Sequence, residues 1–169
     1  MTKKARERRL VEMPSELVSI ELDDLPRFGF SQGAIAQLRA YLADLPLLPR
    51  FNHSRVFVGP ASLTTPAMMV LARRVGQAYR SHNISLRDTP AGSQLDRLRL
   101  AYLRADSLQS LNRNDWQRAL GEAAIFISEA LAGHVDLLSR LLAERATSNL
   151  PTFVGSEARL DPIEAIELT

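Results

Sequence analysis

The sequence contains no cysteine. This absence excludes disulfide bonds, catalysis by a thiolate, iron–sulfur clusters and cysteine-ligated zinc. The chain also has no apolar run of the roughly 18 residues that a membrane-spanning helix requires, and its N-terminus lacks the apolar segment of a signal peptide. We therefore expect a cytoplasmic protein without a membrane span.

Lysine is almost missing as well. Of the 21 basic residues, only Lys3 and Lys4 are lysines, and the other 19 are arginines. Residues 1–9 carry a net charge of +4, whereas the whole chain carries +2; this basic arm holds Lys3, Lys4, Arg6, Arg8 and Arg9 against Glu7. The rest of the chain is therefore slightly acidic, which argues against a basic nucleic-acid surface over its body. The arm could add affinity for phosphate, or it could be a solvated terminus.

The overall composition is that of one globular domain, with 169 residues of which 46% are apolar and 24% charged. We expect a basic arm and lead-in over 1–19 and a single α/β domain over 20–169. Periodic apolar residues predict helices over 31–45, 66–79, 93–109 and 133–149, and short apolar runs predict strands over 55–59, 84–86, 123–127 and 150–154. The alternation predicts a three-layer α/β fold with an open, mostly parallel sheet.

The turn after the first predicted strand carries the main chemical signal. Residues 59–66 have the length and place of a phosphate-binding loop, between a buried strand and a helix that begins near Pro66. In the pattern G-x-x-x-x-G-K-[ST], the second glycine lets the backbone approach phosphate, the lysine contacts the β and γ phosphates, and the hydroxyl holds magnesium. Thr64, Thr65 and Pro66 occupy those places here. We interpret the segment as a phosphate loop that has lost its chemistry, with Gly59, Ser62, Thr64 and Thr65 as its remnants.

With these features the chain resembles the AAA-type P-loop ATPases, most closely the helicase loaders and transposition helper ATPases of bacteria. The resemblance covers residues 20–160 and rests on segments in the family's order: 20–25, 56–60, 125–129, 137–142 together with Arg145, and 150–156. It implies a P-loop-like fold in which Ser156 ends a sensor-like strand. We also expect the strands of Val56 and Ile125 to be adjacent in one sheet, and their separation would count against this interpretation. The chain stops soon after the sensor-like strand, so we expect no helical lid domain.

The departures from the family point away from catalysis. Ser128 stands where the family has the acid that organises magnesium, and only Glu129, at the place of the residue that activates water, remains. Without a loop lysine or a magnesium ligand, the charge of a transferred phosphoryl group would not be neutralised. We therefore expect an inactive ATPase-like protein, with no cofactor and no metal, that serves as an adaptor or assembly module for itself or for a partner protein.

Two alternatives stay open. The first is an enzyme with a non-standard loop, in which Glu129 and Ser156 serve a nucleotide or another phosphorylated ligand near Gly59. The second is a nucleic-acid accessory protein that uses the basic arm and helix arginines. The three histidines lack the spacing of metal ligands, and we expect each at the surface or at a helix edge: His53, His82 and His134.

Overall fold

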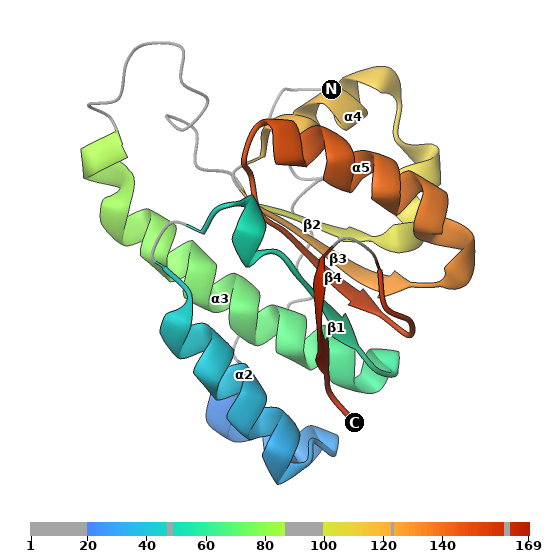
Figure 1. The fold of residues 1–169 in the computed structure, drawn as a ribbon. Helices are drawn as coiled ribbons and strands as arrows, with labels where there is room; N and C mark the ends of the chain where they lie inside the picture. Colours follow the sequence, from blue (N-terminus) through green and yellow to red (C-terminus); the bar gives the residue numbers. More distant parts are fainter. Residues whose placement is uncertain (1–19, 47–48, 87–99, 123, 161–162) are drawn as a thin grey trace.

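The computed structural model describes residues 20–46, 49–86, 100–122, 124–160 and 163–169, which form an α/β fold (Figure 1). These residues hold one five-stranded sheet, composed of β1 (Arg55–Val58), β2 (Leu100–Arg104), β3 (Ala124–Ala130), β4 (Thr152–Ser156) and β5 (Glu164–Glu167). The strand order is β2-β3-β4-β1-β5, and every neighbouring pair is parallel. The predicted three-layer α/β class with a parallel sheet is confirmed, and it is consistent with a P-loop-like fold.

Helices cover both faces of the sheet. α2 (Gln32–Asp44) and α3 (Ala61–Leu86) lie on one face, and α4 (Arg113–Gly121) and α5 (Val135–Thr147) lie on the other (Figure 1). Short 3-10 helices join these elements: η1 (Leu22–Phe28), η2 (Phe51–His53), η4 (Ala105–Ser110) and η5 (Ala132–His134). No helix in the described ranges combines the length and the apolar character needed to cross a membrane.

The core consists of two apolar layers, one on each face of the sheet. Phe57, Phe126 and Phe153 belong to the layer beneath α2 and α3, and the rings of Phe126 and Phe153 stack with their centroids 5.2 Å apart. Val56 and Ile125 belong to the layer beneath α4 and α5. Because the central strands are buried on both faces, their sequences are continuous apolar runs, which made β1 and β3 predictable.

The elements with the strongest patterns follow the sequence predictions. The helix predicted over 31–45 is confirmed as α2, and Ser31 caps it by accepting a hydrogen bond from the amide of Ala34 at 3.1 Å. The helix over 133–149 is confirmed as α5, and the strands over 55–59 and 123–127 are confirmed as β1 and β3. The strand predicted over 150–154 exists as β4, two residues further along the chain.

The prediction between α3 and α4 is wrong. The strand predicted over 84–86 is the end of α3, and the helix predicted over 93–109 contains strand β2 and η4 in its described part, while 93–99 lie outside the described residues. Leucines separated by arginines suit an amphipathic helix as well as a strand. Parallel pairing with β3, in which Leu103 lies opposite Ile127, decides in favour of the strand.

The strands of Val56 and Ile125 lie in one sheet, but they are not adjacent, so that expectation is wrong. β4 lies between them, and its Val154 pairs with Val56 on one side and Ile127 on the other. A strand that comes later in the chain is inserted here, and no local pattern shows such an insertion. β5, which pairs with β1, was not predicted, because the glutamates at its ends, Glu164 and Glu167, obscure its apolar residues.

Candidate ligand-binding site

A cavity of about 260 Å³ opens at the carboxyl edge of the sheet. Open α/β sheets bind ligands at this edge, because the segments that follow parallel strands converge there. Four strands contribute to the lining: Gly59, Ala61 and Thr64 follow β1, Arg104 and Asp106 come from the end of β2, Glu129, Ala130, Leu131 and His134 from β3 and η5, and Gly155, Ser156 and Glu157 from β4.

The segment interpreted as the remnant of a phosphate-binding loop is helical from Ala61 on, so the turn expected before a helix that begins near Pro66 is wrong. α3 begins at Ala61, and the amides of Leu63 and Thr64 donate to the carbonyl of Pro60 at 2.9 and 3.0 Å. Pro66, expected in the first turn of this helix, lies in its second turn. With threonine in place of the second glycine, no glycine or proline stands between Pro60 and Pro66, and the helix starts directly after Pro60.

Thr64 packs between the start of α3 and strand β4. A Cβ atom added at Gly155 would lie 3.0 Å from the Cβ of Thr64, so α3 and β4 approach as closely as a glycine permits. Thr64 is only 1% exposed, yet it lines the cavity, and its hydroxyl has no hydrogen-bond partner within the described part of the chain. A hydroxyl without a partner on a residue that lines a cavity is available to a ligand there.

Glu129 adopts a strained backbone conformation at the cavity. Its φ of 56° lies in the left-handed region, and β3 and β4 shift register between Ile127 and Ala130. The Glu129 carboxylate forms an ion pair with Nε of Arg104 at 3.0 Å, and the same guanidinium lies 3.4 Å from the carboxylate of Asp106. Backbone strain of this type is concentrated at functional sites, where the surrounding structure holds it in place.

Four of the predicted site residues meet at the cavity: Gly59, Thr64, Glu129 and Ser156. The buried Ser156 accepts from the amide of Ala158 through Oγ at 3.1 Å, and its carbonyl accepts from the amide of Gly59 at 2.9 Å. The other three predicted residues of the fold, Ser62, Thr65 and Ser128, are not among the lining residues. The arm residues Lys3, Lys4, Arg6, Arg8 and Arg9 lie outside the described residues.

Sequence reasoning missed four charged or polar residues of the cavity: Arg104, Asp106, His134 and Glu157. The sequence pattern places Arg104 and Asp106 in a helix, and only the pairing of β2 with β3 brings them to this edge. His134 and Glu157 follow β3 and β4 closely, and a position just after a predicted strand was the one signal available for them. Nδ1 of His134 accepts from the amide of Leu131 at 3.1 Å, which orients the imidazole at the rim.

The opposite, amino edge of the sheet is closed by a buried arginine. Arg145 of α5 is 0% exposed, and it was part of the family resemblance. Its guanidinium donates at 2.7 to 3.3 Å to the Thr152 hydroxyl and to four carbonyls, those of Ala119, Leu120, Glu122 and Pro151. These bonds join the end of α4 and the start of β4 to α5, so Arg145 has a structural role in this chain.

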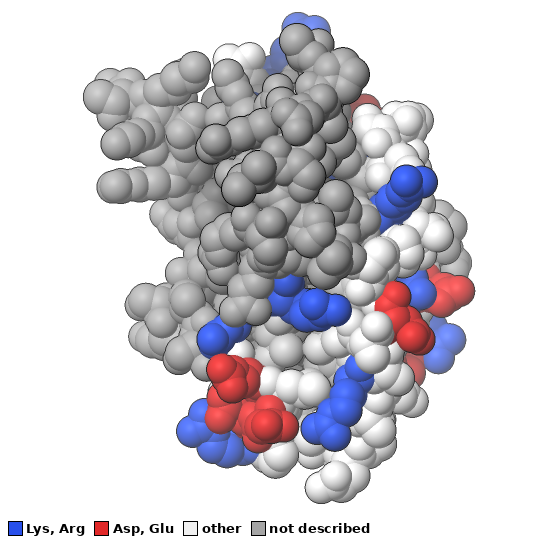
Figure 2. Space-filling view, turned by 90° about the vertical axis from the view of Figure 1, so that its left-hand side faces the viewer, with Lys and Arg blue, Asp and Glu red and all other residues white. Residues whose placement is uncertain are grey.

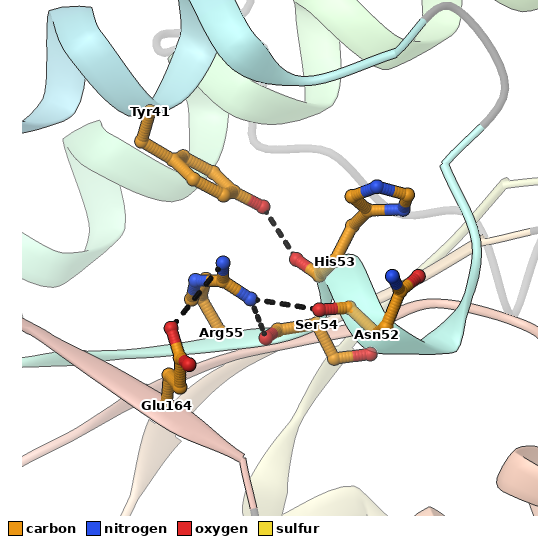
Figure 3. Close-up of polar contacts among 6 residues, drawn as sticks. All are labelled: Tyr41, Asn52, His53, Ser54, Arg55 and Glu164. Atoms are coloured by element: carbon orange, nitrogen blue, oxygen red, sulfur yellow. Dashed lines mark hydrogen bonds and ion pairs between the residues drawn. The ribbon is translucent and has the colours of Figure 1, made fainter.

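A second polar cluster at the amino edge surrounds the start of β1 (Figure 3). Tyr41 of α2 donates to the carbonyl of His53 at 2.7 Å, and the guanidinium of Arg55 lies over the Tyr41 ring, 5.2 Å from its centroid. Arg55 also donates to the carbonyls of Asn52 and Ser54 and lies 3.4 Å from Glu164 of β5. Burial raises the pKa of the Tyr41 hydroxyl above its ordinary value, so this donor stays protonated.

Comparison of the sequence with known protein families and curated proteins adds nothing to the chemistry of the site. No protein-family model matches the chain, and no curated protein matches its sequence. The described ranges contain no group of three or more side chains that could hold a metal ion. On the face drawn in Figure 2, the basic and acidic side chains of described residues lie next to one another instead of forming a continuous basic area.

Proposed function

We propose that the protein is a catalytically inactive, P-loop ATPase-like binding module that acts in the cytoplasm as an adaptor or assembly component. It associates with a second copy of itself or with a partner ATPase and does not turn over nucleotide. The observation that carries the proposal is the helical start of α3. The residues that would hold phosphate form the first turns of this helix, and Thr64 is packed against Gly155.

The charges of the cavity support the same conclusion. A triphosphate is strongly anionic, and its transfer requires cations that neutralise the developing charge. The cavity instead presents the carboxylates of Asp106, Glu129 and Glu157 against the guanidinium of Arg104, which is already paired with two of them. A chain of phosphates placed here would meet net repulsion. This observation counts against the alternative of a nucleotide-dependent enzyme.

The rim of the cavity supports association with another protein. Leu131 is 50% exposed and Val135 is 37% exposed, and they are the exposed large apolar side chains among the residues described. Both lie where β3 leads into α5, on either side of His134. Neighbouring apolar side chains that remain at the surface are typical of contact sites between proteins.

The nucleotide part of the proposal is tested by calorimetry and by an assay of phosphate release. Titration with ATP or ADP in the presence of Mg²⁺ should give no saturable heat, and phosphate release should not exceed that of buffer. ATP turnover that is lost in the Glu129→Gln variant would overturn the proposal, because it would show a working water-activating residue.

The association part is tested by light scattering and by capture of a partner. Self-association gives a mass above the 18.8 kDa of one chain, and Leu131→Ser shifts it toward the monomer, whereas Ala36→Ser on the exposed side of α2 leaves it unchanged. Association with a partner instead gives recovery of an ATPase in a pull-down, again weakened by Leu131→Ser. A chain that stays monomeric and recovers no ATPase would refute this part of the proposal.

A further inference from the structure

The cavity at the carboxyl edge has a positive pole on its β1 side. Ala61 begins α3 and lines the cavity, and its amide donates to no backbone carbonyl within the described residues. Free amides at the start of a long helix favour an anionic group. Independently, Thr64 lines the same cavity while the residue as a whole is only 1% exposed, and its hydroxyl has no hydrogen-bond partner among described residues. The Ala61 amide and the Thr64 hydroxyl together provide donors for a carboxylate.

The cavity has a negative pole on its β2 and β3 side. Glu129 and Asp106 share the guanidinium of Arg104, at 3.0 and 3.4 Å, and Glu157 adds another carboxylate to the lining. Three carboxylates against one guanidinium leave a net charge of −2 when His134 is neutral. Since Arg104 cannot balance this charge alone, an ammonium or guanidinium group is favoured at this pole.

The two poles are separated by the part of the sheet between β1 and β3. Only β4 lies between these strands, so the separation is two strand spacings, roughly 10 Å. Ala130 and Gly155 line the cavity without a charge, and they suit an apolar stem. The volume of about 260 Å³ fits a small metabolite. It lies just below the roughly 300–1,000 Å³ of pockets that take drug-sized ligands.

We propose that this cavity binds a small, elongated molecule with a carboxylate at one end and an ammonium or guanidinium at the other, as in an ω-amino acid. The carboxylate lies at the start of α3 and the hydroxyl of Thr64, and the cationic end lies at Glu129. The inference rests on the proposed function, because the cavity must be free of nucleotide, and it goes further by naming the chemical class of the ligand.

A series of three probes tests the two poles in the unmodified protein. ε-Aminocaproate carries both charged ends, hexylamine lacks the carboxylate, and hexanoate lacks the ammonium. Calorimetric titration should give saturable binding of ε-aminocaproate, and each single-ended probe should bind about tenfold more weakly, because it loses one charge-assisted contact. Equal binding of hexylamine and ε-aminocaproate would overturn the proposal, and so would the absence of saturable binding of ε-aminocaproate at millimolar concentration.

Two variants assign the poles to residues. Thr64→Val should weaken ε-aminocaproate several-fold and leave hexylamine unchanged, whereas Glu129→Gln should weaken ε-aminocaproate and hexylamine and leave hexanoate no weaker. Glu164→Gln removes the same charge at the amino edge of the sheet, so it is the matched control and should change no affinity. Equal effects of Glu129→Gln and Glu164→Gln would show that the cation binds by general charge alone and would refute the assigned site.

Failure of this inference is distinguishable from failure of the proposed function. If ATP is not turned over and ε-aminocaproate does not bind, only the inference fails. If the protein turns over ATP, the proposed function fails whatever the amino acid titration shows, and the inference falls with it.

Discussion

The polar groups at the two edges of the sheet differ in how they are hydrogen-bonded. At the amino edge, Arg145 donates to five acceptors while fully buried, and the cluster of Tyr41 and Arg55 joins α2, β1 and β5. At the carboxyl edge, the Thr64 hydroxyl has no partner within the described residues, and Glu129 keeps a left-handed backbone.

This difference distinguishes polar groups that stabilise the fold from polar groups that are available to a ligand. Buried polar groups cost free energy unless they are hydrogen-bonded, so the hydrogen bonds of Arg145 and Tyr41 at the amino edge are explained by stability alone. The carboxyl edge combines an unsatisfied hydroxyl, a cavity and backbone strain, and stability does not explain such an arrangement.

Removal of the arginine at the amino edge should be the most damaging change. Arg145→Leu leaves the carbonyls of Ala119, Glu122 and Pro151 buried without their donor, and we expect the free energy of unfolding to fall by about 3–5 kcal/mol in urea titrations. Arg140→Ala removes an exposed arginine of the same helix, so it should cost no more than about 1 kcal/mol. Similar losses for the two variants would show that Arg145 does not hold this edge together.

Relief of backbone strain should act at the carboxyl edge and not at the amino edge. Glu129→Gly removes the left-handed strain and the ion pair with Arg104, and we expect the free energy of unfolding to rise by about 1 kcal/mol. Asn149 has a similar φ of 57°, but asparagine tolerates this conformation and its side chain accepts from the amide of Phe51 at 3.3 Å. Asn149→Gly should therefore give no gain, and a loss of stability in Glu129→Gly would contradict the assignment of strain.

Acidification should weaken the amino edge slightly. Burial lowers the pKa of His53 from its ordinary value of 6.5, and the charges of Arg55 and Arg50 act in the same direction. The unfolded chain therefore takes up this proton at higher pH than the native protein does. The contribution to stability is complete above pH 6.5 and is lost as the pH falls through the lowered native pKa. Thermal unfolding of His53→Gln should show a smaller decrease over this range; an identical pH profile would exclude His53 as its source.

A helix or strand can be predicted from the sequence when its structure is determined by residues that lie close together in the chain. β1 and β3 were predicted because strands that are buried on both faces consist of continuous apolar runs. α2 was predicted because its cap, Ser31, and its apolar spacing are local signals. β2 was mistaken for helix, since its strand state depends on pairing with residues 24 positions further along the chain, as in Leu100 with Ala124. Of the cavity residues, Gly59, Glu129 and Ser156 were found because each lies at the end of a predicted strand.

The α/β class, the central strands and the absence of a glycine and a lysine at Thr64 and Thr65 could all be read from the sequence, because apolar periodicity and residue identity are local properties. Only the tertiary structure decided that β4 separates β1 from β3, that residues 61–66 continue as helix against Gly155, and that Arg104 and Asp106 join Glu129. These outcomes depend on which distant strands pair and on how closely a helix packs on them. Such contacts are set by the sum of many interactions across the chain.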